Sequence, residues 1–362
     1  MQPFSEAIRF AQAHEVCWPR EPTAPLAPGQ KPFGVHHDDP LPWNRLRGPV
    51  HGRGPVSGVV RVAGREVACW GEPDRADLTF SVAKTYLALL AGVAYGRGLL
   101  RDPYEPVAKC LPGIGFDAPH NASITWAHLL QQTSEWEGSC FGLPETVDRN
   151  RKVSHDPHPP LGRKGDARPL QVPGTYWEYN DVRINQLSLA LLHLFGQALP
   201  EVFSEAILQP IGASGNWHWA GYDDAWLDLS LRDGGTRRVQ SVPGGTHWGG
   251  GISISARDQA LVGQLMLDSG RHNERQLIPA DWLARMREPC ALAPFYGWLT
   301  WLNTDHAMFP GASTDSYCMV GAGGNYVWME PAHDAVVVVR WLDAEHAPEF
   351  IAQMAARLPT LA

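Results

Sequence analysis

The spacing of apolar residues predicts several amphipathic or buried helices along the chain. After Ser81, apolar positions 83, 87, 90 and 94 recur at helical spacing, and Gly96 marks the expected end of that helix. Residues 4–14 carry a similar apolar face. The same periodicity predicts further helices over 126–132, 182–195 and 348–358.

Two β-hairpins are predicted, one near each end of the chain. Residues 58–62 and 66–70 flank a short Ala-Gly-Arg turn, and 326–329 and 335–341 flank the turn at 331–334. The simplest architecture is one sheet built from both ends, with a helical region inserted between them. We therefore predict an α/β fold of the α+β type. Segments 1–98 and 252–362 form the sheet-containing domain, and 99–251 forms an inserted, mainly helical domain.

Composition and charge narrow the classes of partner. The 362 residues carry a net charge of −8 and no basic run, which argues against a nucleic-acid surface. No apolar stretch is long enough to span a membrane, and the first residues lack the pattern of a signal peptide. We expect a cytoplasmic protein with no membrane span, and the sequence leaves its oligomeric state open.

Cysteine and histidine patterns do not predict a metal site. The six cysteines are scattered without a C-x-x-C pair, which favours buried free thiols. The run His36-His37-Asp38-Asp39 places potential ligands next to one another, and consecutive residues seldom converge on one ion. No metal or organic cofactor is predicted.

The motif Ser81-Val82-Ala83-Lys84 opens the first long apolar helix and is the strongest chemical signal. It places Ser81 at a helix N-terminus with Lys84 one turn later on the same face. The helix dipole favours negative charge at Ser81, and a nearby amine can take the proton of the hydroxyl. Taken alone, the motif is weak, because Ser and Lys three residues apart occur by chance in many helices, and a capped amphipathic helix is then the favoured interpretation.

Two further segments add candidate residues. Tyr179-Asn180-Asp181 follows a Pro-Gly turn, and Asp181 is expected to cap the next helix. A phenol such as Tyr179 held near an ammonium can act as general base and then acid, although a half-buried structural tyrosine is the alternative.

A glycine-rich turn, Gly321-Ala322-Gly323-Gly324-Asn325, precedes the strand at 326–329. Such a turn lets a substrate approach the backbone, and its amide can form an oxyanion hole with the Ser81 amide. The alternative is a tight, flexible turn. The run is not G-x-G-x-x-G, and the chain has no G-x-S-x-G, so neither a dinucleotide fold nor an α/β-hydrolase is indicated.

Taken in order, five segments resemble the serine β-lactamase and penicillin-binding-protein superfamily, most of all its class C-like serine hydrolase branch of esterases and amidases. They are Leu78–Lys84, Ile124–Ser134, Pro173–Asp181, Trp248–Asp258 and Gly321–Val339. The resemblance implies an antiparallel sheet flanked by N- and C-terminal helices, with an inserted helical domain and the site at their junction.

The resemblance also implies roles for individual residues. Ser81 corresponds to the nucleophile, Lys84 to its activating partner and Tyr179 to the proton shuttle. The amides of Ser81 and Ala322 correspond to the oxyanion hole. Gly321, Gly323 and Asn325 would then lie beside the substrate.

Two departures from the family pattern affect the expected substrate. Asn180-Asp181 stands where the family has Ser-Asn, so Asp181 adds a negative charge that is expected to contact the substrate. Met319-Val320-Gly321 lacks the Lys or His that helps to hold a substrate carboxylate. The resemblance thus implies an esterase or amidase acting on a less anionic small molecule.

Four aromatic residues near the motifs are candidates for a pocket wall, and the alternative for each is a place in the core. They are Trp136, Trp177, Trp248 and Tyr296.

Other functions remain open at this stage. A transpeptidase or D-aminopeptidase, a weak β-lactamase, or a non-catalytic ligand sensor could use the same fold.

Overall fold

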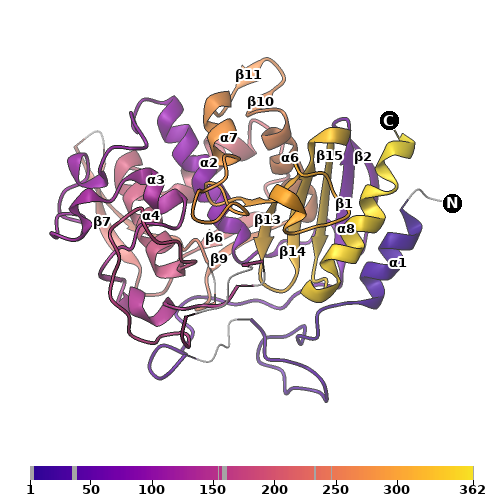
Figure 1. Ribbon diagram of the computed structural model, residues 1–362, viewed down its shortest axis with the longest axis horizontal. Coiled ribbons are helices and arrows are strands. Elements are labelled where there is room, and N and C mark those ends of the chain that lie inside the picture. Colours follow the sequence, from indigo (N-terminus) through magenta and orange to yellow (C-terminus); the bar gives the residue numbers. More distant parts are fainter. Residues whose placement is uncertain are drawn as a thin grey trace.

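The computed structural model describes residues 4–34, 39–153, 155–156, 161–231, 234–245 and 247–361 (Figure 1). His36, His37 and Asp38, which the sequence offered as a possible metal-binding run, lie outside the described residues.

An antiparallel sheet of six strands forms the centre of the fold and confirms the predicted pairing of both chain ends. Its strand order is β12-β13-β14-β15-β1-β2. The two hairpins meet where β1 pairs with β15, with Gly58 opposite Val339. The strands are β1 (Ser57–Val62), β2 (Arg65–Trp70), β12 (Trp301–Leu302), β13 (Tyr317–Gly321), β14 (Asn325–Glu330) and β15 (Ala335–Arg340).

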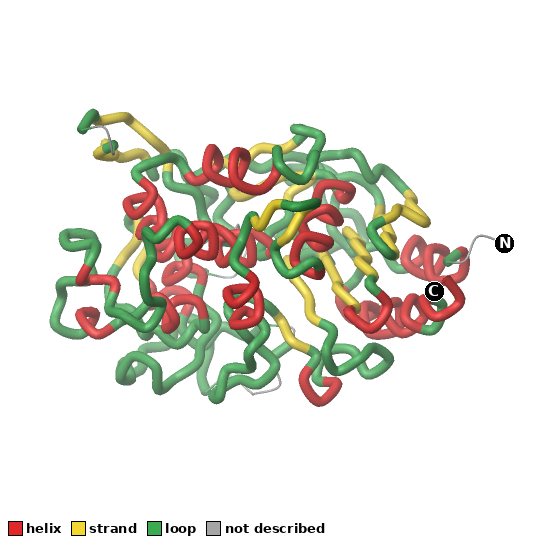
Figure 2. Tube along the Cα trace, turned by 90° about the horizontal axis from the view of Figure 1, so that it is seen from above, coloured by secondary structure: helices red, strands yellow, loops and turns green. Residues whose placement is uncertain are grey.

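Helices cover both faces of this sheet. Every residue of β14 and β15 is buried, as expected for strands that are covered on both sides. Helix α6 (Ala256–Leu267) packs Gly263 against Val327 and Val336. Helices α1 (Ser5–Ala13) and α8 (Ala347–Ala355) lie side by side near the two termini (Figure 2), and Phe350 of α8 contacts Trp70 of β2.

The predicted central helices are also present, together with a short helix, α7 (Ala280–Met286), which packs against α2. Helix α2 (Val82–Gly96) is buried along residues 82–94 and packs against α4 (Asp181–Phe195), while α3 (Trp126–Leu130) and α5 (Leu199–Phe203) are shorter. Asn180, rather than the predicted Asp181, caps α4, because its side chain accepts the amides of Val182 and Arg183.

Segment 99–251 contains more strand than the sequence suggested. A three-stranded sheet joins β3 (Asp77–Leu78), β9 (Gly251–Ile254) and β6 (Trp217–Ala220), and β7 (Trp226–Ser230) pairs with β8 (Thr236–Gln240). Alternating aromatic and polar residues in these strands suit half-buried β-structure. The division into domains at 98/99 and 251/252 remains a prediction.

The remaining elements are short. Two further strand pairs are β4 (Ser139–Cys140) with β5 (Leu143–Pro144), and β10 (Arg271–His272) with β11 (Arg275–Gln276). Ser204–Leu208 is a π-helical turn, and 3₁₀ turns lie at Val107–Lys109, Asn121–Ser123, Glu145–Asp148, Thr304–His306, Pro331–His333, Ala344–His346 and Leu358–Leu361.

All six cysteines are free thiols, as predicted, although only Cys140, Cys290 and Cys318 are buried. Across the described ranges, no single helix is both long and apolar enough to cross a membrane. The bent pair Asp181–Phe195 and Leu199–Leu208 passes this test of length and composition only when its two members are joined.

Candidate active site

Ser81 stands at the N-terminus of α2, directly after a residue with an unusual backbone conformation. Phe80 has a φ of 52°, in the left-handed region that side-chain-bearing residues seldom adopt. Its ring is buried against Trp18, Phe33 and Trp341. We infer that this aromatic cluster compensates the backbone strain at Phe80, which turns the chain so that Ser81 begins the helix.

Lys84 lies beneath Ser81 and is almost wholly buried. Its Nζ donates to Ser81 Oγ at 2.9 Å and to the carbonyl of Gly244 at 3.1 Å. The same Nζ forms an ion pair with Asp181 Oδ1 at 2.6 Å. Helical spacing therefore brings the predicted Ser81–Lys84 pair into contact, and the fold adds a carboxylate below it.

The Asp181 carboxylate is the centre of a buried group of charges. Its Oδ2 lies 2.6 Å from Arg151 Nη1 and 2.6 Å from His247 Nδ1. Arg151 also pairs with Asp148, which lies 3.4 Å from Lys164. We call Lys84, Asp148, Arg151, Lys164, Asp181 and His247 the site cluster.

Burial and neighbouring charge together set the pKa values of Asp181 and His247 in this cluster. Burial by itself would raise the pKa of Asp181, but Arg151 and Lys84 outweigh it and hold that pKa well below its usual range. Burial, with Arg151 acting in the same direction, lowers the pKa of His247 to about 4. His247 is thus neutral at neutral pH, while Asp181 is ionised.

Tyr179 lies over the two cations that contact Asp181. Lys84 Nζ is 4.7 Å from the centre of the Tyr179 ring, and the Arg151 guanidinium carbon is 5.5 Å from it. The ring also lies against Trp301, with centroids 5.8 Å apart. The entrance of α4 therefore brings both Tyr179 and Asp181 into contact with the same two positive charges.

The end of β13 approaches the Ser81 backbone closely. A Cβ atom at Gly321 would lie 2.0 Å from the Thr79 carbonyl oxygen and 3.3 Å from the Ser81 nitrogen, so only glycine fits there. Ala322 follows in the turn between β13 and β14. Within the described part of the chain, neither the Ser81 nor the Ala322 amide donates a hydrogen bond, so both are available to an oxyanion.

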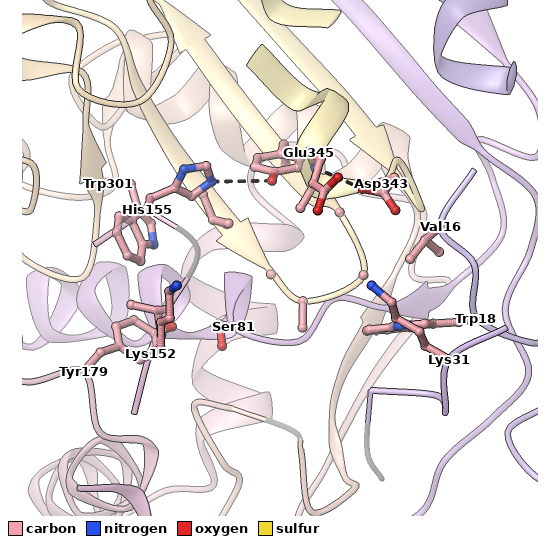
Figure 3. Close-up of a pocket in the computed structure, with 18 of the residues that line it drawn as sticks. Val16, Trp18, Lys31, Ser81, Lys152, His155, Tyr179, Trp301, Asp343 and Glu345 are labelled. Atoms are coloured by element: carbon pink, nitrogen blue, oxygen red, sulfur yellow. Dashed lines mark hydrogen bonds between the residues drawn. The ribbon is translucent and has the colours of Figure 1, made fainter. Parts of the chain in front are cut away.

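A cavity of about 560 Å³ opens over Ser81. Figure 3 shows Ser81 between Tyr179 and Lys152 on one side and Trp18 and Lys31 on the other. Gly321, Ala322, Gly323 and Gly324 line the cavity, as does Val320, which stands near the position where the family carries a cation. Sequence reasoning did not single out several other lining side chains. Trp301 and Tyr326 come from β12 and β14, and the rest come from loops without a motif, among them Val16, Trp18, Lys31, Arg151, Lys152, His155, Asp343 and Glu345.

Several residues expected beside the substrate do not line this cavity. Asp181, which was expected to contact the substrate, is 1% exposed, faces cations of the protein and is not among the residues that line the cavity. Trp136 and Trp248 are buried in the core, where the Trp248 indole donates to the Trp43 carbonyl. Trp177 lines a neighbouring cavity of about 270 Å³, which shares Arg151, Lys152 and Tyr179 with the first, and the buried Tyr296 packs against Trp177.

Asn325 supports the turn between β13 and β14 and is not among the residues that line the cavity. Its Nδ2 donates to the Ala322 carbonyl at 2.7 Å, and its Oδ1 accepts Arg340 Nε at 3.3 Å. Arg340, buried at the end of β15, also donates to the carbonyls of Leu78 and Ile254. These contacts fix the turn relative to the chain that leads into Ser81.

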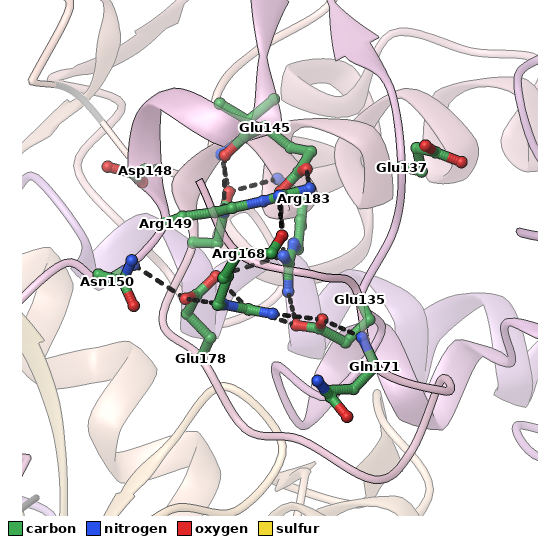
Figure 4. A network of polar contacts seen from close by, with 12 residues as sticks. Glu135, Glu137, Glu145, Asp148, Arg149, Asn150, Arg168, Gln171, Glu178 and Arg183 are labelled. Carbon is green, nitrogen blue, oxygen red and sulfur yellow. Dashed lines mark hydrogen bonds and ion pairs between the residues drawn. The ribbon is translucent and has the colours of Figure 1, made fainter. Parts of the chain in front are cut away.

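A second buried charge network lies beside the site cluster (Figure 4). Arg183 of α4 pairs with Glu135 at 2.7 Å, Glu145 at 3.0 Å and Glu178 at 3.2 Å. Arg168 also pairs with Glu135 and Glu178, and Arg149 pairs with Glu145. We call Glu135, Glu145, Arg149, Arg168, Glu178 and Arg183 the loop network, because it joins residues 135–178 to α4.

Asp148, Asp181 and His247 have ligand-type atoms within 4.8 Å of one another. Lys84, Arg151 and Lys164 already face the two carboxylates, so a divalent ion at this place would add to three positive charges. These residues therefore have the composition of a metal site, but their surroundings are those of a salt-bridge cluster.

Structural comparison finds similar folds among hydrolases and penicillin-binding proteins. A penicillin-binding protein homologue from Caulobacter crescentus has a TM-score of 0.60 and 13% identity, covering 88% of this chain and 94% of its own. EstCE1, a hydrolase with promiscuous acyltransferase activity, has a TM-score of 0.59 and 16% identity, covering 84% and 93%. A D-stereospecific amidohydrolase from Streptomyces has a TM-score of 0.52 and 16% identity, covering 79% and 88%.

At the level of sequence, no curated protein matches. The model of the Beta-lactamase family, however, matches residues 72–355, which include Ser81, Lys84, Tyr179 and the β13–β14 turn. Since this match extends over most of the chain, the chain belongs to the Beta-lactamase family, and it shares the fold of that family's hydrolases.

Proposed function

We propose that this protein is a serine hydrolase that cleaves an ester or amide bond through an acyl-enzyme on Ser81. The observation that carries the proposal is that Ser81 and Tyr179 line one cavity, beside two available backbone amides, and that the buried Lys84 contacts both of them. A nucleophile, a proton acceptor and an oxyanion site are the parts that acyl transfer requires.

In the first step, Ser81 Oγ attacks the substrate carbonyl as its proton passes to the Tyr179–Lys84 pair. The carbonyl oxygen becomes an oxyanion that accepts the amides of Ser81 and Ala322. The proton then goes to the leaving group as the carbon–leaving-group bond breaks. Water repeats these events on the acyl-enzyme and releases the acid. Removing one donor from such an oxyanion site typically costs roughly 10²–10³-fold in rate.

The charged and apolar side chains around the cavity indicate which substrates it can accept. Val320 gives the β13 edge an apolar wall, while Lys31 and Lys152 line the cavity from other segments. We propose esters or amides of small carboxylic acids as substrates. Because β13 carries no cation to hold a substrate carboxylate, uncharged esters and amides should be accepted at least as well as β-lactams.

Acyl transfer to an amine or alcohol is a second candidate within the same mechanism. The structural neighbour EstCE1 is described as having promiscuous acyltransferase activity. Adding an amine acceptor to an ester assay tests this candidate, because transfer yields an amide product in place of the acid.

Hydrolysis of short-chain p-nitrophenyl esters tests the proposed function, with nitrocefin measured in parallel. We expect steady turnover by the wild type, slower turnover of nitrocefin, and a loss of roughly 10⁴-fold or more in kcat for Ser81→Ala. A thermal melt of Ser81→Ala serves as the folding control. Unchanged turnover by Ser81→Ala would overturn the proposal, and one acyl group bound without turnover would instead indicate a sensor.

A further inference from the structure

The further inference concerns the chain that precedes the family match, and it rests on the proposed function. The match begins at residue 72, yet four residues near the N-terminus line the catalytic cavity: Val16, Cys17, Trp18 and Lys31. We call residues 15–34 the N-terminal wall. It brings side chains to the nucleophile that the motifs of the family do not provide.

Hydrogen bonds to the body of the protein hold this wall in place. The Val16 amide donates to the Trp341 carbonyl, directly after β15, at 2.8 Å. The buried Arg53 guanidinium donates to the carbonyls of Val16 and Trp18, at 3.2 and 2.6 Å. The wall is therefore a fixed part of the fold, and its side chains have defined positions beside the cavity.

Trp18 packs directly against the catalytic backbone. Its ring centroid lies 5.6 Å from that of Phe80, the residue before Ser81. A Cβ atom at Gly323 would lie 2.7 Å from the Trp18 ring, so the indole also contacts the β13–β14 turn that carries Ala322. An acyl group held at the oxyanion site thus has an aromatic surface next to it.

A cation and an anion lie at the same end of the cavity as Trp18. Lys31 and Glu345 are both exposed cavity residues, and neither side chain makes a hydrogen bond or an ion pair with another residue that the structure describes. The nearby Asp343 carboxylate, in contrast, accepts the Glu345 amide at 3.0 Å. The side chains of Lys31 and Glu345 are therefore available to a ligand.

The proposed mechanism indicates which part of a substrate meets these charges. Tyr179 takes part in returning the proton to the leaving group, so the leaving group must lie on its side of Ser81. Figure 3 shows Lys31 and Glu345 on the opposite side of Ser81 from Tyr179. The acyl chain of the substrate therefore extends towards Trp18, Lys31 and Glu345.

We propose that this acyl chain ends in a free α-amino acid. Its carboxylate pairs with Lys31, its ammonium pairs with Glu345, and its methylene groups lie against the Trp18 ring. An α-amino acid carries both charges on one carbon, so it suits a cation and an anion at one end of a cavity. The substrate class is side-chain esters and amides of acidic amino acids, such as γ-glutamyl compounds. Hydrolysis breaks the side-chain acyl bond, and water supplies the hydroxyl to the acyl carbon and a proton to the leaving alcohol or amine.

The test compares four methyl esters that differ only in these two charges. Glutamate γ-methyl ester carries both charges, monomethyl glutarate only the carboxylate, methyl 4-aminobutyrate only the ammonium, and methyl butyrate neither. A second set, one methylene longer, is derived from 2-aminoadipate. The release of methanol gives kcat/KM for each ester, and p-nitrophenyl butyrate is the uncharged reference for the proposed function.

Each charge should add to the rate through its own partner. We expect each to raise kcat/KM by about two- to fivefold, and the two together by about tenfold over the uncharged ester in one of the sets. Lys31→Met should abolish only the advantage of the carboxylate, and Glu345→Gln only that of the ammonium. Lys109→Met removes an exposed lysine that does not line the cavity, and this control should change neither.

The outcomes separate this proposal from the proposed function. Loss of each preference in its own variant supports the proposal. If p-nitrophenyl butyrate is hydrolysed through Ser81 but the four esters of each set react equally, or the preferences survive both substitutions, the function stands and the proposal is overturned.

If no ester is turned over, the proposed function fails, and calorimetric binding of glutamate γ-methyl ester then decides the role of the wall. Binding that weakens in both Lys31→Met and Glu345→Gln, but not in Lys109→Met, would support the amino-acid site. Absent binding, or binding unchanged in both variants, would overturn it.

Discussion

The site cluster and the loop network are built from the same kinds of groups, yet they differ in what they touch. Each is buried, and each pairs basic side chains with carboxylates at 2.6–3.4 Å in most of its contacts. Each takes one member from the first turn of α4: Asp181 in the site cluster and Arg183 in the loop network. The site cluster contacts Ser81 and borders the cavity, while the loop network contacts neither.

This comparison shows that the presence of a buried salt bridge does not by itself tell whether it serves stability or chemistry. Desolvation offsets much of the attraction in such pairs, so their presence does not by itself indicate stability. What distinguishes the clusters is whether a charge faces a group that must gain or lose a proton. We therefore expect changes in the site cluster to alter chemistry, and changes in the loop network to alter folding.

The largest expected effect is on catalysis. Tyr179→Phe keeps the ring against Trp301 but removes the proton acceptor, so kcat/KM for an ester should fall by roughly 10²–10⁴-fold. The thermal midpoint should change little, since the packing of the ring is retained. A loss of less than tenfold, measured by ester hydrolysis, would remove Tyr179 from the proposed mechanism.

In the loop network, Arg183→Met should instead lower stability. The substitution leaves Glu135, Glu145 and Glu178 without the cation that they share. The free energy of unfolding, measured by denaturant titration, should therefore fall by about 3–5 kcal/mol. The folded fraction should keep the wild-type pH profile of acylation. A shifted profile with unchanged stability would break the comparison between the clusters.

Acid should destabilise the protein in two pH windows, an upper one set by buried histidines and a lower one set by buried carboxylates. Burial lowers the pKa of His247 and of His155 from 6.5 to about 4, so the unfolded chain binds more protons in that range and stability falls as pH drops through it. For Glu135, burial opposes ionisation, but Arg168 and Arg183 lower the pKa from 4.5 to about 2, so its contribution is lost between those values.

Denaturant midpoints measured across both windows check this expectation. His155→Phe should remove only part of the fall in stability with pH in the upper window, because the contribution of His247 remains. Glu135→Gln should reduce the dependence of stability on pH in the lower window, to which Asp181 also contributes, and should leave the upper window unchanged. A protein equally stable from pH 6.5 to about 4 would show that the histidines are not buried in neutral form.

The smallest expected effect concerns Lys152, which is exposed at the cavity and makes no hydrogen bond or ion pair with another described residue. Lys152→Met should raise KM for an ester with a free carboxylate by about two- to tenfold, with little change for a neutral ester. Equal effects on both esters would show that Lys152 does not recognise substrate charge.

Local periodicity explains why much of the fold was predictable. The apolar spacing after Ser81 and the two valine-rich hairpins fix α2 and the β1–β15 pairing from residues close together in sequence. The segments around 217–240 were missed, because short strands with exposed polar residues resemble loops.

The contacts of the site were less predictable than its motif residues. Asp181 was expected to cap α4 and meet the substrate, but Asn180 takes the cap and two distant loops supply Arg151 and His247. No pattern in the sequence marks those loops. Trp136 and Trp248 lie near motifs along the chain, but nearness in sequence does not determine on which side of the backbone a ring packs.

The most direct test of the account is the mass of the protein shortly after it meets an activated ester. Mixing with p-nitrophenyl butyrate, followed by an acid quench and intact mass analysis, should reveal one added acyl group. Peptide mapping should place the group on Ser81, and Ser81→Ala should show none. Turnover without any adduct, or an adduct that persists in Ser81→Ala, would contradict the account.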